Sequence, residues 1–181
     1  MHSHNIHIKD TDALHRKIIL FKTHLFHVVS DFDRTLTKAF VNEQKFQSSY
    51  ALIREGKYLT PDYPSKAQAL FENYHPFEIS STISPLERNE KMVQWWSEHF
   101  ELMKECGMSK GVIEDIVAKG KIEFRAGALE FFDVLSQHKI PLLIFSAGVG
   151  DIIKELLESA GKIQLNVHLL SNFYVFDTLG R

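Results

Sequence analysis

The 181-residue sequence has one cysteine, Cys106, and no apolar run that approaches the ~18 residues of a membrane-spanning helix. A single cysteine excludes an internal disulfide and a cysteine-rich zinc site, and it is typical of a reducing cytosol. Basic residues are not in excess, since the net charge is −2, so no nucleic acid polymer is expected as a partner. Residues 1–7 contain no apolar signal segment. We therefore expect a cytoplasmic protein that binds no membrane.

The remaining composition is that of an ordinary globular protein, with 44% hydrophobic and 24% charged residues. Short apolar runs alternate with helical patterns near the N-terminus and again after residue 123, which predicts an α/β fold with a parallel sheet and right-handed crossovers. The predicted strands cover residues 25–30, 140–145, 167–170 and 173–177. The predicted helices of this part cover residues 12–22, capped by Asp12, and residues 127–138 and 149–160.

Residues 39–122, called here the cap segment, differ in character from the rest of the chain. Three helical patterns follow one another without a convincing strand, at residues 64–74, 85–106 and 109–120. We expect two domains: an α/β core formed by residues 1–38 and 123–181, and a helical cap formed by residues 39–122. Because the insertion follows the first strand, the cap is expected over the carboxyl ends of the strands, where open α/β sheets bind ligands.

Two carboxylates separated by one residue, Asp31 and Asp33, follow directly on the first predicted strand. Acids this close repel one another unless a cation lies between them, and Mg²⁺ takes oxygen ligands from one or two carboxylates and a phosphate. An aspartate can also accept a phosphoryl group, while a second carboxylate protonates the leaving oxygen and later activates water. The alternative is a pair of acids that cap a loop.

A second segment, Ser146-Ala147-Gly148, ends the strand at residues 140–145 and precedes a predicted helix. A serine hydroxyl and neighbouring backbone N–H groups at a helix N-terminus form a cradle for a phosphate. The alternative is a tight turn between a strand and a helix without a ligand.

Together these segments resemble motifs one and two of the haloacid-dehalogenase superfamily of phosphatases. Val29 to Thr37, Ile144 to Asp151 and Leu170 to Phe173 resemble, more closely, the cytosolic pyrimidine and 7-methylguanosine 5'-nucleotidases, and the likeness extends over about residues 14–181. Residues 74–79 and 92–96 are similar to the helical cap of that family.

This resemblance implies roles for individual residues. Asp31 would be the nucleophile and a Mg²⁺ ligand, and Asp33 the general acid/base and a Mg²⁺ ligand through its backbone carbonyl. Ser146 and Ala147, with Gly148 in the same substrate-binding segment, would hold the phosphate, and Glu78 would contact the nucleoside. His99 lies near a base-contacting position of the cap, or is a helix-surface histidine, and Tyr50 either stacks on a base or is a core aromatic.

The implied function is Mg²⁺-dependent hydrolysis of nucleoside 5'-monophosphates through an aspartyl-phosphate. The alternatives are a phosphatase of another small phosphomonoester, such as a phosphoamino acid, and an inactive nucleotide-binding module. The family's lysine after the third strand and its Gly-Asp…Asp motif have no match in these 181 residues. We therefore expect little or no phosphatase activity from the chain as written, and self-association through an uncovered apolar face.

Overall fold

A three-stranded parallel sheet organises the molecule in the computed structural model, which describes residues 10–23, 26–41, 43–45, 48–119, 122–178 and 180. The strands are β1 (Val28–Ser30), β4 (Leu142–Val149) and β5 (Val167–Asn172), in the order β1-β4-β5. Val29 pairs with Leu143, and Ile144 pairs with Leu169. The predicted α/β class and the first three strands are confirmed, although residue 25 lies outside the described residues.

The predicted fourth strand at residues 173–177 is wrong, because these residues have no regular structure. The backbone N–H of Tyr174 donates to Oδ2 of Asp151 at 2.9 Å, so a side chain takes the bond that a sheet ladder would need. Phe173 lies against Gly150, where a Cβ atom would come within 2.7 Å of its ring. Side-chain contacts to the start of α7 therefore hold this segment, which its β-branched and aromatic composition alone does not reveal.

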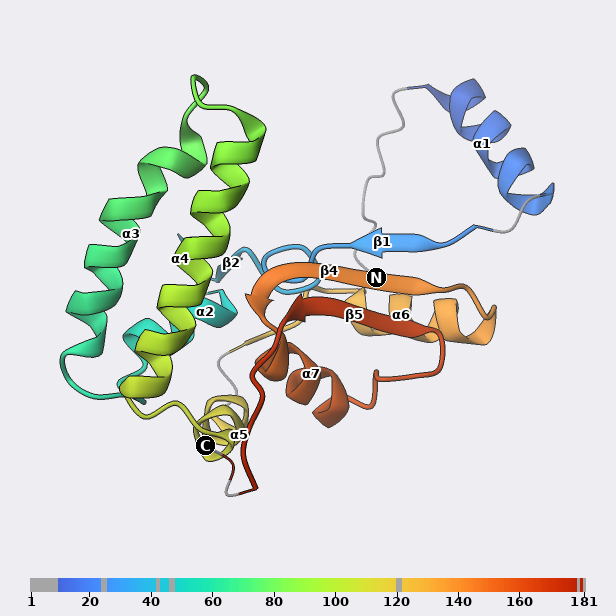
Figure 1. Ribbon diagram of the computed structural model, residues 1–181. Coiled ribbons are helices and arrows are strands. Elements are labelled where there is room, and N and C mark those ends of the chain that lie inside the picture. Colours follow the sequence, from blue (N-terminus) through green and yellow to red (C-terminus); the bar gives the residue numbers. More distant parts are fainter. Residues whose placement is uncertain are drawn as a thin grey trace.

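Two helices cover one face of the sheet, α6 (Ala128–Gln137) and α7 (Gly150–Ser159), and both lie below it in Figure 1. Right-handed crossovers that advance in one direction across a sheet place their helices on the same face. Leu142 and Ile144 of β4 are fully buried there, as are Phe132 of α6 and Ile153 of α7. This layer is the hydrophobic core beneath the site.

The opposite face of the sheet is apolar and open to solvent. Val29, Phe145 and Leu170 point to this side and are 57%, 58% and 54% exposed. They belong to the three neighbouring strands, so the exposed side chains form one continuous face rather than scattered positions. Parallel sheets are usually covered on both faces.

The described residues of the cap segment form a short hairpin and four helices. The elements in chain order are β2 (Phe40–Val41), β3 (Gln44–Lys45), α2 (Ser49–Glu55), α3 (Tyr63–Ile79), α4 (Pro85–Glu105) and α5 (Lys110–Ala118). The hairpin and α2 were not predicted, because each is shorter than a periodic pattern needs to be recognised. Helix α3 was predicted to end at Tyr74 but continues through Pro76. A proline removes only one backbone hydrogen bond of a helix, so the turn that follows it can still form.

Local chemistry explains where the longer cap helices begin and end. Ser84 caps α4 by accepting from the N–H of Glu87 at 3.1 Å, and Gly107, with a φ of 94°, follows its last turn. Ser109 caps α5, as predicted, by accepting from the N–H of Val112. Helix α1 (Thr11–Thr23) is instead capped by Asp10, whose Oδ1 accepts from the N–H of Ala13, so the prediction of Asp12 as the cap is wrong.

The chain leaves and re-enters the α/β layer at one place. Thr37 forms an isolated bridge with Phe124, and the N–H of Lys38 donates to the carbonyl of Glu123 at 2.9 Å. Figure 1 shows the α3–α4 pair standing beyond the arrowheads of the three strands. The carboxyl ends of the strands therefore face the cap helices. No helix among the described residues is both long enough and apolar enough to cross a membrane.

Candidate active site

Asp31 follows the last residue of β1 and lies in a solvent-exposed position. Its Oδ2 accepts a hydrogen bond from the hydroxyl of Thr35 at 3.2 Å. The chain between them turns around the carbonyl of Phe32, which accepts from the backbone N–H groups of Thr35, Leu36 and Thr37. This turn anchors the Asp31 carboxylate at the sheet edge through residues of its own loop.

Asp33 is held by a different part of the chain. The backbone N–H of Ser49 donates to its Oδ1 at 2.9 Å, and the hydroxyl of Ser49 donates to its Oδ2 at 2.8 Å. Burial raises the pKa of the Asp33 carboxyl above its usual value, and the negative charge of Asp31 adds to this, whereas both bonds from Ser49 act in the opposite direction. A raised pKa favours the protonated form that a general acid needs.

The Ser146-Ala147-Gly148 segment lies beside Asp33. A Cβ atom on Gly148 would come within 3.1 Å of Oδ2 of Asp33 and within 3.3 Å of the hydroxyl oxygen of Ser146. The backbone N–H of Gly148 lies 3.1 Å from that hydroxyl oxygen and donates to it. The structure thus brings Asp33 beside Ser146 and Gly148, which lie more than a hundred positions later in the sequence.

Strand β4 reaches further than predicted and includes this segment. It runs to Val149, and its pairing with β5 is irregular between Phe145 and Val149. Side chains of β5 fix the irregular part: the hydroxyl of Ser171 donates to the carbonyl of Gly148 at 2.9 Å, and the amide of Asn172 donates to the carbonyl of Ala147 at 3.0 Å. These bonds replace the regular ladder and hold Ser146 in its place.

An open cavity of about 580 Å³ lies between α4 and the carboxyl ends of β4 and β5. This volume is within the range of small-molecule sites. A hollow of similar size, 590 Å³, lies between α3 and α4, and none of the predicted site residues lines it. The lining of the first cavity consists of Asn89, Met92, Val93, Trp96, Ser97, Phe145, Ser146, Ala147, Leu170, Ser171 and Asn172.

Glu78 is apart from this cluster in the structure. It lies in the last turn of α3, and its carboxylate pairs with Nδ1 of His75 at 2.9 Å. The side chain is 51% exposed and does not line the 580 Å³ cavity.

His99 is buried rather than on the helix surface, with 2% of the residue exposed. Its Nε2 lies 2.7 Å from the hydroxyl of Tyr50 and 3.0 Å from the hydroxyl of Tyr63. Burial lowers the pKa of His99 to about 4, and the positive charge of Arg54 contributes. The ring is therefore neutral at pH 7 and joins α2, α3 and α4 through two tyrosine hydroxyls.

Two adjacent tryptophans, Trp95 and Trp96, pack in different directions. Trp95 stacks on Tyr74 of α3, with ring centroids 6.0 Å apart. Trp96 meets the ring of Tyr50 edge to face, with ring centroids 6.2 Å apart, and lines the cavity.

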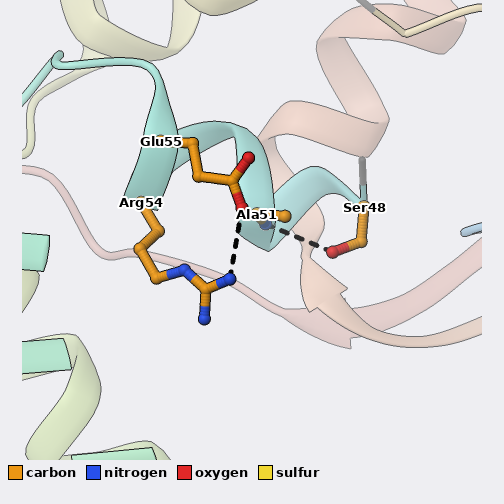
Figure 2. A network of polar contacts seen from close by, with 4 residues as sticks. All are labelled: Ser48, Ala51, Arg54 and Glu55. Carbon is orange, nitrogen blue, oxygen red and sulfur yellow. Dashed lines mark hydrogen bonds and ion pairs between the residues drawn. The ribbon is translucent and has the colours of Figure 1, made fainter. Parts of the chain in front are cut away.

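Ser49 is the site residue that sequence reasoning missed. Two serines before the apolar run that begins at Tyr50 are a helix-start signal, and the structure places a helix there. Figure 2 shows this helix start, where the hydroxyl of Ser48 accepts from the N–H of Ala51 and Arg54 pairs with Glu55. The signal identifies Ser48 as the cap but does not indicate that Ser49 reaches Asp33.

The donor set at the end of β1 fits Mg²⁺. The Asp31 carboxylate is exposed at the sheet edge, whereas both oxygens of Asp33 accept bonds from Ser49. Asp33 would therefore contribute its backbone carbonyl, and water and a phosphate oxygen would fill the other positions, as Mg²⁺ sites commonly allow. Within the described parts of the chain, no three histidine, cysteine or acidic side chains gather as an all-protein cage.

The fold is shared with solved structures. The crystal structure of cytosolic 5'-nucleotidase IIIB bound to cytidine matches with a TM-score of 0.77 and 28% identity, over 95% of this chain and 59% of that one. A phosphoserine phosphohydrolase-like protein from Francisella tularensis shares the fold with a TM-score of 0.52 and 17% identity, over 86% of this chain and 62% of that one. The chain has the haloacid-dehalogenase-like fold that the motifs predicted.

The family follows from sequence comparison. The family model described as pyrimidine 5'-nucleotidase (UMPH-1) matches residues 34–181, and the chain belongs to this family. It is 36% identical over 153 residues to the 7-methylguanosine phosphate-specific 5'-nucleotidase of Mus musculus, and this match covers 84% of this chain and 51% of that protein. It is 37% identical over 154 residues to the putative cytosolic 5'-nucleotidase 3 of Caenorhabditis elegans, covering 83% and 41%. The chain thus spans about half the length of these relatives.

Proposed function

We propose that this chain is the nucleophile-bearing part of a Mg²⁺-dependent phosphomonoesterase that hydrolyses nucleoside 5'-monophosphates through an aspartyl-phosphate. The observation that carries the proposal is that the side chains of Asp33 and Ser146 both lie beside Gly148. There the carboxylate of Asp33 and the hydroxyl of Ser146 meet at the carboxyl end of β4. Membership of a 5'-nucleotidase family supports the same conclusion.

The proposed first step is attack of an Asp31 carboxylate oxygen on the phosphorus. The bond between phosphorus and the 5'-oxygen breaks, and Asp33 gives its proton to the departing nucleoside oxygen. The raised pKa of Asp33 supports this role, because the group must hold a proton until the oxygen leaves. The hydroxyl of Ser146 and the nearby backbone N–H groups would hold the phosphoryl oxygens.

In the second step, water attacks the phosphorus of the aspartyl-phosphate. Asp33, now a carboxylate, takes a proton from that water, and the bond to the Asp31 oxygen breaks to release phosphate. Both groups return to their starting states. Mg²⁺, held by the Asp31 carboxylate and the Asp33 backbone carbonyl, would supply charge neutralisation for the phosphate.

The nucleoside is proposed to occupy the 580 Å³ cavity between the strands and α4. Its aromatic wall at Trp96 and its amide and hydroxyl groups at Asn89 and Ser97 suit a flat, polar base. Glu78 is proposed to contact the nucleoside, which requires its exposed carboxylate, outside the lining of this cavity, to leave His75 and to move towards the ligand. A cytoplasmic location and the division into a core (1–38 and 123–181) and a cap (39–122) belong to the same proposal.

A panel of phosphomonoesters tests this function. The chain is incubated with each nucleoside 5'-monophosphate, 7-methylguanosine monophosphate, phosphoserine and p-nitrophenyl phosphate, with Mg²⁺ or with EDTA, at protein concentrations above the substrate. Mg²⁺-dependent phosphate release that favours nucleotides supports the proposal, and the same assay measures the slow turnover expected of these 181 residues. Preference for phosphoserine over every nucleotide would contradict it.

A further inference from the structure

The two acids of the site are held in different ways. Asp31 is anchored by Thr35, four residues along its own loop. Asp33 is anchored by Ser49, which is sixteen residues away and belongs to the first turn of α2 in the cap segment. The nucleophile position is therefore fixed by the core alone, whereas the position of the acid/base depends on the placement of a cap helix.

Ser49 fixes the Asp33 carboxylate at two points. Its N–H meets one oxygen at 2.9 Å and its hydroxyl meets the other at 2.8 Å, so rotation of the carboxylate about its Cβ–Cγ bond would break both bonds. Ser49 is 0% exposed, so water does not compete for either donor. The N–H involved is one that the helix itself leaves without a partner, because it lies in the first turn.

Ser49 also lies against the phosphate-binding segment. A Cβ atom built on Gly148 would lie 2.5 Å from the hydroxyl oxygen of Ser49. The Ser49 hydroxyl is therefore packed against the backbone of β4 at Gly148. Helix α2 is therefore docked directly on β4 when the two bonds to Asp33 are formed.

We propose that Ser49 is a positioning residue that orients Asp33 for proton transfer and ties this group to the docking of α2 on β4. The inference rests on the proposed function, in which Asp33 protonates the leaving oxygen. Ser49 itself touches neither the phosphorus nor the leaving group in this scheme. Its effect is on where the proton donor points.

The leaving group separates this role from a structural one. A nucleoside 5'-oxygen leaves as an alkoxide unless it is protonated, whereas p-nitrophenolate is a stable anion that needs little protonation. Ser49→Ala is expected to lower kcat for nucleoside monophosphates roughly 10- to 100-fold, with KM nearly unchanged, because a misplaced general acid loses part of its effect. The kcat for p-nitrophenyl phosphate is expected to fall by a smaller factor, because its first step needs no proton from Asp33 and only the hydrolysis of the aspartyl-phosphate still depends on this group.

A volume-conserving variant and a matched control accompany this measurement. Ser49→Cys keeps the size of the side chain but offers only a weak S–H donor, so it should reproduce the split seen with alanine. Ser48→Ala removes the cap of α2, which accepts from the N–H of Ala51, and leaves both bonds to Asp33 in place. It should weaken the helix without any preference between the two substrates.

A second measurement needs no turnover. Urea unfolding midpoints are compared for Asp33→Ala, Ser49→Ala and the double variant. Because the Ser49 hydroxyl bonds to the Asp33 carboxylate, and Asp33→Ala already removes this bond, the midpoint of the double variant should fall no further than that of the more affected single variant. Additive shifts would overturn the inference, since they would mean that the two residues do not act on one another.

The outcomes distinguish the positioning role of Ser49 from the proposed phosphatase function. Turnover by the unaltered chain, with equal losses for both substrates in Ser49→Ala and Ser49→Cys, would overturn the positioning role and leave the phosphatase in place. If the unaltered chain turns over no phosphomonoester, the unfolding midpoints decide: additive shifts overturn the positioning role, and non-additive shifts support it. A split in kcat with non-additive midpoints supports both.

Discussion

A side chain at Gly148 would collide with Ser49: a Cβ atom there would lie 2.5 Å from the hydroxyl oxygen of Ser49. Real Cβ atoms essentially never come this close to another heavy atom. The absent side chain is what permits β4 and α2 to meet, and their meeting brings the Ser146-Ala147-Gly148 segment to Asp33.

We predict that Gly148→Ala destabilises the protein and lowers its activity. The added methyl group must displace the fully buried Ser49, and overpacking of this kind costs about 1–3 kcal/mol. Urea unfolding and phosphate release measure the two effects. Gly111→Ala in α5 is the control, because its Cβ atom would have only one neighbour, at 3.9 Å, and should raise stability by about 0.5–1 kcal/mol. Wild-type stability and activity in Gly148→Ala would contradict the close approach.

Asp31→Asn is expected to abolish phosphatase activity. An amide is a poor nucleophile and a weaker metal ligand, and losing a covalent nucleophile costs on the order of 10³-fold or more in kcat. Asp115→Asn is the control, a surface acid of α5 that pairs with Lys119 and lies outside the site. If Asp31→Asn kept more than about a tenth of the wild-type kcat, the aspartyl-phosphate mechanism would be wrong.

Glu78→Ala should weaken nucleotide substrates more than p-nitrophenyl phosphate. A charge-assisted hydrogen bond to the nucleoside is worth about 1.5–3 kcal/mol. p-Nitrophenyl phosphate has no nucleoside and therefore cannot form this bond with Glu78. The ratio of kcat/KM for the two substrates is the measurement. Glu72→Ala, an exposed acid of the same helix that accepts from Gln68, should leave this ratio unchanged. Equal losses on both substrates would make Glu78 a structural residue.

His99 should make the protein less stable as the pH falls. Burial holds its pKa at about 4 in the folded protein, against 6.5 for an unperturbed histidine, so the unfolded chain binds the proton more readily between these values. The stabilising effect is complete above pH ~6.5 and decreases as the pH falls towards about 4, by on the order of 3 kcal/mol in total.

Urea unfolding at pH 7.5 and pH 5 measures this effect. His99→Gln should flatten the decrease between the two values, because the buried proton acceptor is gone. His168→Gln, which removes an exposed histidine of β5, should keep the full decrease. The same decrease in all three proteins would assign the pH dependence to other groups.

Self-association through the open sheet face is also expected. Val29 is 57% exposed on the edge strand β1 of this apolar face, and such faces drive association in water. Light scattering coupled to gel filtration should show an average mass that rises with concentration, and Val29→Thr should reduce this rise. Val134→Thr, a valine of α6 that is 50% exposed on another surface, is the control. A monomer at all concentrations would contradict the prediction.

Sequence patterns predicted the elements that are long enough for their apolar spacing to repeat. Helices α4 and α7 begin and end within one or two residues of their predicted positions, because their apolar spacing and their flanking serine and glycine residues agree. The hairpin at Phe40–Val41 and Gln44–Lys45 has two residues in each strand, which leaves no period to detect. Residues 173–177 had the composition of a strand, but the Asp151 carboxylate binds their backbone instead.

The candidate site shows the same limit more sharply. Asp31, Asp33 and Ser146 were predicted from the sequence because each follows or ends an apolar strand. Ser49 was not found, since its importance comes only from the tertiary contact between α2 and Asp33. The neutral state of His99 likewise depends on the burial of its ring beside the hydroxyls of Tyr50 and Tyr63. Burial and long-range partners have no local signature.

The divergent packing of the two tryptophans supplies an optical reporter for the cavity. The sequence has two tryptophans, and Trp96 lines the cavity while Trp95 stacks on Tyr74. In a Trp95→Phe variant, all indole fluorescence would come from the cavity wall. A nucleoside that stacks on Trp96 would quench this emission, whereas free phosphate or ribose phosphate would leave it unchanged. Occupancy of the cavity by a base is thus readable from light emission, in real time and without turnover.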